Sequence, residues 1–204
     1  MRLILVRHGH ADPDGAGRYW GQSDVLLTGL GREQAEKLRR YLESEKIDAV
    51  YSSELRRCYE TAATITAGRS LDITRCTELN EVNFGKLEGL TYEEISQRYP
   101  EVTRLWEDWD PALAFPEGEN FEQFAARVAT FIKRLAEHTG DETVLVVGHG
   151  GVFKLLLCYL AGLGIEHWWK FRFDIGSVSI LDVHNGTATI SLLSDVSHLN
   201  SDRE

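Results

Sequence analysis

The sequence is poor in the features that mark several large classes of protein. It has only three cysteines, Cys58, Cys76 and Cys158, with no CxxC pair or zinc-like spacing among them, which argues against a disulfide framework or a structural zinc site. The longest apolar stretch, Leu155–Leu163, falls well short of the roughly 20 residues of a membrane helix. The apolar start, Met1–Val6, is too short for a signal peptide. We therefore expect a cytoplasmic protein with reduced thiols.

Basic charge is scarce as well. Lysine and arginine together number 22 against 32 acidic residues, a formal net charge of −10. We therefore expect no nucleic-acid partner and no membrane partner. An anionic ligand must instead be bound by a few local cations. The 204 residues contain four prolines and no repeat or low-complexity tract, and they fit a single domain spanning residues 1–204.

Short apolar runs alternate with helical patterns along most of the chain. Buried strands are predicted at 2–6, 47–51 and 143–147, a hairpin at 177–183 and 187–193, and helices at 28–44, 53–65, 120–135 and 152–160. Thr28, Ser53 and Asn120 are the expected N-caps of the first three helices. The alternation predicts an α/β fold: a three-layer α/β/α sandwich with a mostly parallel sheet and an edge hairpin. The segment at about 78–119 fits least and is interpreted as a lid, and the polar tail at about 194–204 is expected to fray.

Two of the apolar strands end in nearly the same motif. The first runs into Arg7-His8-Gly9 and the third into Gly148-His149-Gly150. In an open parallel sheet, ligands bind outside the carboxyl ends of the strands. Each strand therefore delivers a histidine to that edge, followed by a glycine that lets backbone N–H groups approach a ligand. If the strands are neighbours, the two imidazoles face each other across one pocket.

A third piece follows the strand at 47–51. The helix that begins there offers free N–H groups and the positive end of its dipole to an anion. Arg57, in its first turn, can reach the same pocket as Arg7. Two guanidiniums suit a phosphoryl dianion because each can bind two oxygens. Either Arg56 or Arg57 lies on a solvated face of this helix, and helical phase alone does not decide which.

These motifs together resemble one known family. Arg7-His8-Gly9, Ser53-x-Leu55-x-Arg57-Cys58-x-Glu60-Thr61-Ala62, Leu79-x-Glu81-x-x-Phe84-Gly85-x-x-Glu88-Gly89 and Gly148-His149-Gly150 occur in the order seen in the histidine phosphatase superfamily, the phosphoglycerate mutases and their phosphatase relatives. The likeness covers residues 2 to about 182 and implies a phosphoglycerate mutase-like fold.

The resemblance also implies roles for individual residues. His8 matches the nucleophile that becomes a phosphohistidine, and Glu81 matches the proton donor to the leaving oxygen. Arg7, Arg57 and His149 match the groups around the transferred phosphoryl. No metal or cofactor is implied. The expected substrate contacts are Gly9, Asp14, Gly21 and Gly150.

The expected activity is hydrolysis of a small phosphorylated metabolite. A mutase must grip a substrate with several anionic groups, yet residues 78–119 hold 11 acidic and three basic residues, which favours the phosphatase branch over the mutase alternative. The stretch Gly15–Asp24 is similar to α-ribazole-5′-phosphate phosphatases, and phosphoserine and broad-specificity phosphatases look alike here. Trp20, Trp106, Trp109 and Phe115 either line a pocket for a ring-bearing leaving group or form the core of the lid.

Two positions depart from the pattern of the family. Many relatives have Glu or Gln after the first motif and Asn six residues after its histidine, where this chain has His10 and Asp14. The run of His8, His10, Asp12 and Asp14 also supplies the ligand types of a metal-dependent hydrolase, which is a second hypothesis. A third hypothesis is a phosphate-binding protein without activity.

The aromatic segment near the C-terminal hairpin has two interpretations. Trp168 and Trp169, with Phe171 and Phe173, either pack beneath the edge hairpin or form an exposed patch that joins two copies as a homodimer.

Overall fold

The computed structural model describes residues 1–110, 112–138 and 140–200. The strands are β1 (Arg2–Arg7), β2 (Ala49–Ser53), β3 (Ile73–Cys76), β4 (Thr143–Gly148), β5 (Val178–His184) and β6 (Thr187–Asp195). The α-helices are α1 (Gly29–Tyr41), α2 (Arg56–Ile65), α3 (Tyr92–Arg98), α4 (Pro100–Glu107), α5 (Phe121–Leu135) and α6 (Gly150–Leu160). Short 3-10 helices are η1 (Thr77–Leu79), η2 (Gly85–Leu87), η3 (Ile165–Lys170) and η4 (Ser197–Leu199).

The six strands form one sheet in the order β3-β2-β4-β1-β5-β6. The first four run parallel, and β5 and β6 add an antiparallel hairpin at the edge. Asn185 and Gly186 both have positive φ, 51° and 77°, as a two-residue hairpin turn requires. The predicted sheet is confirmed, apart from β3, whose four residues, only two of them apolar, give no clear strand pattern.

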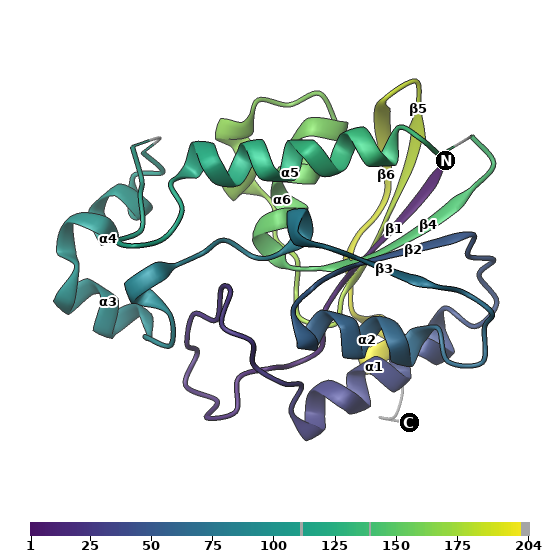
Figure 1. The fold of residues 1–204 in the computed structure, drawn as a ribbon, viewed down its shortest axis with the longest axis horizontal. Helices are drawn as coiled ribbons and strands as arrows, with labels where there is room; N and C mark the ends of the chain where they lie inside the picture. Colours follow the sequence, from purple (N-terminus) through teal and green to yellow (C-terminus); the bar gives the residue numbers. More distant parts are fainter. Residues whose placement is uncertain (111, 139, 201–204) are drawn as a thin grey trace.

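Helices cover both faces of the sheet, as Figure 1 shows for α5 and α6 on one side and α1 and α2 on the other. Side chains alternate between the two faces along each buried strand. Leu3 and Leu5 of β1 pack in the core beneath α5 and α6, whereas Ile4 and Val6 pack in the core beneath α1 and α2. The predicted three-layer sandwich is therefore confirmed, with an apolar core on each face.

Two of the three predicted N-caps are confirmed. The Thr28 side chain accepts a hydrogen bond from the N–H of Gly31, and Asn120 forms a capping box with Gln123. The prediction for Ser53 is wrong because α2 begins at Arg56 with Leu55 as its N-cap and no side-chain cap bond. Ser53 lies at the end of β2, where its hydroxyl has a different partner, described below.

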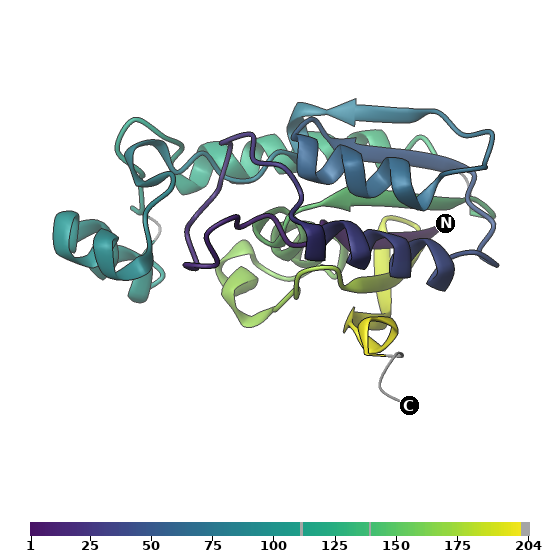
Figure 2. The same ribbon diagram turned by 90° about the horizontal axis from the view of Figure 1, so that it is seen from below.

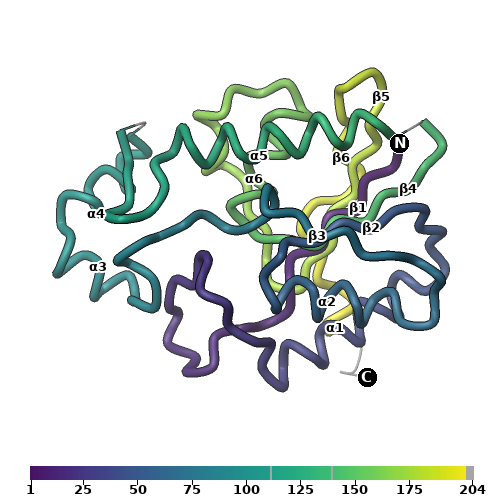
Figure 3. Tube along the Cα trace, in the orientation of Figure 1, coloured from purple at the N-terminus to yellow at the C-terminus, as the bar shows by residue number. Residues whose placement is uncertain are grey.

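The segment at 78–119 extends away from the sheet at the end where β1 and β4 finish, as Figures 2 and 3 show. It contains α3 and α4, and a Thr91–Glu94 capping box begins α3. Its core is aromatic, with the Phe84 and Trp106 rings stacked at 5.6 Å and Phe115 against both. Its function as a lid stays a prediction.

The C-terminal segment is more ordered than expected. Residues 194–200 complete β6 and form η4, where His198 is buried and its Nε2 lies 3.0 Å from the Gly176 carbonyl. Lys37 of α1 donates a hydrogen bond to the Leu199 carbonyl, so fraying is wrong for this part. Residues 201–204 of the predicted tail lie outside the described residues. In the part of the chain that the structure describes, no helix has the length and apolarity to cross a membrane.

Candidate active site

His8 and His149 meet at the carboxyl edge of the sheet because β1 and β4 are parallel neighbours. Arg7 is paired with Gly148 in the register of the two strands, so both histidines follow one position later. Their ring centroids lie 5.0 Å apart at an interplanar angle of 65°, and both side chains are buried. The two histidines form the predicted pair.

The ring of His8 is oriented by its own backbone. Its Nδ1 lies 2.7 Å from the Gly9 carbonyl oxygen, and a carbonyl only accepts, so Nδ1 carries the proton of the neutral ring. The lone pair is then on Nε2. Burial, reinforced by the guanidiniums of Arg57 and Arg7, holds the pKa of His8 well below its ordinary value. His8 is thus a neutral imidazole with one ring nitrogen able to attack phosphorus.

His149 is held by groups from β2 and α2. Its Nε2 lies 3.0 Å from Ser53 Oγ, and its Nδ1 lies 3.4 Å from an Arg57 nitrogen. The Ser53 hydroxyl donates to Asn80, so its oxygen accepts from a proton on His149 Nε2. Burial and Arg57 also hold the pKa of His149 well below its ordinary value.

The Cys58 thiol touches the same histidine but is not a nucleophile. Its Sγ lies 3.2 Å from His149 Nε2. Burial raises the pKa of Cys58 to about 12, so sulfur stays protonated at neutral pH, and only a thiolate attacks efficiently. All three cysteines are free and buried, as expected.

Both predicted arginines, Arg7 and Arg57, reach the site. The structure also decides which arginine of α2 faces the solvent. Arg57 is 1% exposed, whereas Arg56 is on the solvated face of α2. The Arg57 guanidinium donates to the carbonyls of Trp20, Gly21 and Ser23 at 2.6–2.8 Å. It therefore fixes the loop before α1 as well as supplying charge.

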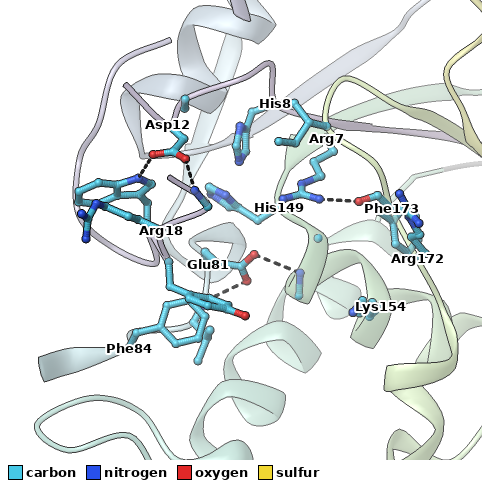
Figure 4. A pocket seen from close by; sticks show the side chains of 18 of the residues that line it. Arg7, His8, Asp12, Arg18, Glu81, Phe84, His149, Lys154, Arg172 and Phe173 are labelled. Carbon is cyan, nitrogen blue, oxygen red and sulfur yellow. Dashed lines mark hydrogen bonds between the residues drawn. The ribbon is translucent and has the colours of Figure 1, made fainter. Parts of the chain in front are cut away.

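Arg7 makes fewer hydrogen bonds within the protein than Arg57 does. One terminal nitrogen donates to the Phe173 carbonyl at 2.6 Å. Its Nε is buried and has no hydrogen-bond partner in the described structure. A buried donor without a partner is costly unless a ligand supplies the acceptor. Arg7 is therefore prepared for an oxyanion beside His8 (Figure 4).

Glu81 lies in the loop between η1 and η2, at the start of the segment at 78–119. Its two carboxylate oxygens accept hydrogen bonds from the backbone N–H groups of Val82 and Gly151, both at 3.1 Å. Figure 4 shows Glu81 below His149, beside the start of α6. Arg127 of α5 donates to the carbonyls of Asn80 and Glu81 at 2.7 and 3.2 Å and so holds the loop that carries this carboxylate.

A cavity of about 800 Å³ opens over these residues. The five predicted catalytic residues and Gly150 line it. Both interpretations of the aromatic residues hold. Trp20, Trp106, Trp109 and Phe115 are among the lining residues, and Trp106 and Phe115 also belong to the aromatic core of the segment at 78–119. Phe173 is buried in the core cluster that includes Leu181 of β5, and Trp168 packs against this cluster. Both side chains also line the cavity, which the sequence did not predict.

Three predicted substrate contacts lie outside this cavity. A side chain on Gly9 would collide with the Gly31 carbonyl of α1, and one on Gly21 would collide with the Val82 carbonyl. Both glycines therefore serve close backbone packing. Asp14 is exposed and lies 3.8 Å from Arg18. Gly9, Asp14 and Gly21 are not among the cavity-lining residues.

The start of α2 is not an open anion site either. The Asp24 carboxylate accepts the Arg56 N–H at 2.7 Å, which places a negative group where the sequence suggested an anion would bind.

The alternative metal site does not assemble from its four candidate ligands. His10 Nδ1 contacts the Thr28 hydroxyl at 2.9 Å, and the Asp12 carboxylate accepts from the Gly17 and Trp20 N–H groups. Asp14 points to Arg18. Across residues 1–110, 112–138 and 140–200, no three His, Cys, Asp or Glu side chains are grouped to hold a metal ion.

Several supporting residues escaped sequence reasoning. Glu88 accepts the N–H groups of Gly21, Gln22 and Ser23 at 2.9–3.1 Å, so it secures the same loop as Arg57. Glu88 belongs to the third motif of the sequence, but the motif does not indicate that its partners are the N–H groups of residues 21–23. The contacts of Ser53 with Asn80 and His149, and those of Arg127 with Asn80 and Glu81, could not be predicted because these partners are distant in sequence.

Covalent transfer of a phosphoryl group is the chemistry that a neutral, buried imidazole between two fixed guanidiniums can perform. The family comparison agrees. The chain belongs to the histidine phosphatase superfamily (branch 1), whose sequence model matches residues 3–196.

Several similar proteins are phosphatases that align with this chain over nearly their whole length. The chain is 38% identical over 194 residues to the adenosylcobalamin/alpha-ribazole phosphatase of Escherichia coli (strain K12), covering 95% of each chain. It is 31% identical over 199 residues to phosphoserine phosphatase 1 of Hydrogenobacter thermophilus, covering 98% of this chain and 94% of the other. The crystal structure of an alpha-ribazole phosphatase from Shigella flexneri matches with a TM-score of 0.88 at 36% identity, covering 96% of both chains. The predicted family and fold are confirmed, and hydrolase activity is supported.

Proposed function

We propose that the protein hydrolyses a small phosphomonoester through a phosphohistidine on His8. The observation that carries the proposal is the His8–His149 pair, 5.0 Å apart, beneath the guanidiniums of Arg7 and Arg57. The reacting form of the enzyme has Glu81 protonated. His8 Nε2 attacks phosphorus, the ester P–O bond breaks, and the Glu81 carboxyl group gives its proton to the departing alcohol oxygen. Water then attacks phosphorus, Glu81 takes a proton from it, and the P–N bond breaks to release inorganic phosphate.

The rate enhancement comes from alignment and fixed charge. Phosphoryl transfer has a loose transition state with charge spread over the equatorial oxygens. Arg7 and Arg57 are held in place by backbone carbonyls, so they need little reorganisation during the reaction. Loss of one such preorganised donor costs about 3–4 kcal/mol of barrier.

The substrate that fits best has a ring on its alcohol half. Much of the cavity lining is an aromatic wall, which includes Trp20, Trp106 and Trp109. Aromatic surfaces bind flat rings well and give little to a small zwitterion such as serine. We therefore favour α-ribazole 5′-phosphate over phosphoserine, in keeping with the activity for which the Escherichia coli relative is named.

A mutase activity is disfavoured by the charge of the same wall. Between residues 78 and 119, the described cavity-lining residues include the acid Glu81 and no lysine or arginine. A mutase must bind a second anionic group of its substrate for as long as the phosphoenzyme exists. The segment at 78–119 contributes no cavity-lining cation that could bind this group.

Turnover of p-nitrophenyl phosphate tests the proposal. We expect activity that EDTA does not change and that His8→Ala abolishes. Absence of turnover between pH 5 and pH 8 favours a binding protein, and loss in EDTA that Zn²⁺ or Mn²⁺ restores favours a metal-dependent hydrolase. For the substrate, kcat/KM for α-ribazole 5′-phosphate is expected to exceed that for phosphoserine.

Two further expectations belong to the proposal. Three free, buried thiols support a cytoplasmic, reducing location. Of the aromatic patch at residues 168–173, Trp169 is the exposed large side chain, at 41%, and it offers a surface for a homodimer. Sedimentation velocity of the wild type and Trp169→Ala tests this association.

A further inference from the structure

Lys154 is a cation of the cavity that the proposed chemistry does not use. It lies on α6, one turn beyond Gly150, and its half-buried side chain lines the cavity. The ammonium group lies 5.3 Å from the centre of the Trp168 ring. No residue of the described chain accepts a hydrogen bond from it or forms an ion pair with it. A cation that has lost part of its hydration without gaining an acceptor is costly.

The charged groups around Lys154 already have hydrogen-bond partners, apart from the Nε of Arg7, which faces the phosphoryl position. Arg172 donates to the Asp174 carboxylate at 2.6 Å, and Arg7 donates to a backbone carbonyl beside the histidines. The Glu81 carboxylate is held by two backbone N–H groups. Burial lowers the pKa of Lys154, while the charge of Glu81 opposes this effect. These two influences on the pKa, burial and a carboxylate that is near but not in contact, are expected of a cation inside the cavity without a direct partner.

Lys154 lies in the part of the cavity where the alcohol half of a substrate is expected to bind. Figure 4 shows Lys154 and Arg172 on one side of the cavity, across from Asp12 and Arg18, with Glu81 towards the middle. The phosphoryl group belongs at His8, and the leaving oxygen belongs at Glu81. The part of the cavity between Glu81 and Lys154, next to the Trp168 ring, is therefore where the remainder of the alcohol binds.

We propose that Lys154 binds an anionic group on the alcohol half of the substrate, next to a ring that packs on the aromatic wall. The inference rests on the proposed function because it takes His8 as the site of the phosphoryl group. It defines the class of substrate that the site prefers: phosphomonoesters whose alcohol carries both a ring and a carboxylate. The alcohol half of α-ribazole 5′-phosphate has the ring but no such anion, so this ester should rank above phosphoserine and below ring-bearing carboxylates. A half-buried ammonium gives a carboxylate a short, charge-assisted hydrogen bond, which an uncharged ring alcohol cannot use.

Three matched substrates test the assignment: benzyl phosphate, 4-carbamoylbenzyl phosphate and 4-carboxybenzyl phosphate. Their substituents differ in charge but are far from the leaving oxygen. For the wild type we expect kcat/KM to be at least about tenfold higher for the carboxylate than for the carbamoyl compound. Lys154→Met should remove this preference and keep benzyl phosphate within about threefold of wild type, whereas Lys154→Arg should retain the preference.

Lys170 is the matched control. Its ammonium also faces a tryptophan ring, that of Trp169 at 5.7 Å, but Lys170 is not among the cavity-lining residues. Lys170→Met should therefore leave the carboxylate preference unchanged. A preference that persists in Lys154→Met overturns the assignment. So does an equal loss with all three substrates, which would place Lys154 in support of Glu81 or of the fold.

Binding separates this inference from the proposed function. The corresponding benzylphosphonates cannot be hydrolysed, and their dissociation constants can be measured by calorimetry with the wild type and Lys154→Met. Absence of turnover with every ester contradicts the proposed function alone. Equal affinity of the wild type for the 4-carboxy and 4-carbamoyl phosphonates contradicts the role of Lys154, whatever the turnover.

Discussion

Replacement of Arg57 by lysine separates the charge of this residue from its structural contacts. The guanidinium reaches three backbone carbonyls through two nitrogens, with distances of 2.8, 2.8 and 2.6 Å, and the residue is 1% exposed. Lysine keeps the charge but has a single nitrogen on a differently shaped stem. It cannot span carbonyls that Arg57 binds with separate nitrogens.

The expected loss of stability follows from those bonds. A hydrogen bond from a charged donor contributes about 1.5–3 kcal/mol. With one or two of the three bonds lost, Arg57→Lys should lower the free energy of unfolding by about 2–5 kcal/mol. Because Arg57 also lies 3.4 Å from His149, kcat/KM for p-nitrophenyl phosphate should fall by about two to three powers of ten.

Urea unfolding of the ligand-free protein, read as a midpoint at constant slope, measures the first quantity. Arg56→Lys is the control because Arg56 is the adjacent, exposed arginine of α2, and its change should stay within about 0.5 kcal/mol. If Arg57→Lys unfolds at the wild-type midpoint, the guanidinium does not secure the loop at residues 20–23, and our account of this arginine is wrong.

Three other predictions concern the acid, its position and the histidines. Glu81→Gln should slow alkyl phosphates by about two to four powers of ten and p-nitrophenyl phosphate far less, because only poor leaving groups need the proton; equal losses contradict the acid role. Gly151→Ala places a methyl group against the Glu81 carboxylate, so kcat should drop while the urea midpoint stays near wild type; unchanged kcat refutes the assigned position of Glu81. Burial lowers the pKa of His8 and His149 in the native state, so the unfolded chain binds more protons below about pH 6.5. The free energy of unfolding is therefore highest above this pH and falls on acidification by up to about 1.4 kcal/mol per pH unit for each histidine. Between pH 7 and pH 5, the melting temperature should fall more for the wild type than for the double variant His8→Asn/His149→Asn. An equal fall in both proteins contradicts this origin.

The sequence predicted the centre of the site because that centre is set by strand ends. Once β1 and β4 are parallel neighbours, their register places His8 beside His149 with little freedom. The same reasoning failed for Gly9 and Gly21, where glycine serves close packing against Gly31 and Val82 rather than contact with a ligand. A glycine in a motif indicates close approach, and sequence alone does not identify the approaching group.

The supporting shell could not be predicted because its contacts join segments distant in sequence. Arg127 of α5 holds the loop that carries Glu81, and Glu88 holds the loop at residues 21–23. Lys154 looks from sequence like an ordinary polar position in an apolar helix. Only the packing of α6 against η3 reveals that it faces Trp168 and the cavity. The helix α3 was missed although its Thr91–Glu94 capping pattern was present, because the surrounding aromatic and acidic residues masked the periodicity.

A covalent bond between phosphorus and His8 is the central claim of this account. Rapid quenching of the wild-type enzyme during turnover of a ³²P-labelled phosphomonoester, under non-acidic conditions, should trap label that peptide mapping assigns to His8. The label should be absent from His8→Ala and should accumulate when the second step is slowed. Label on any other residue, or no label while turnover proceeds, contradicts the claim.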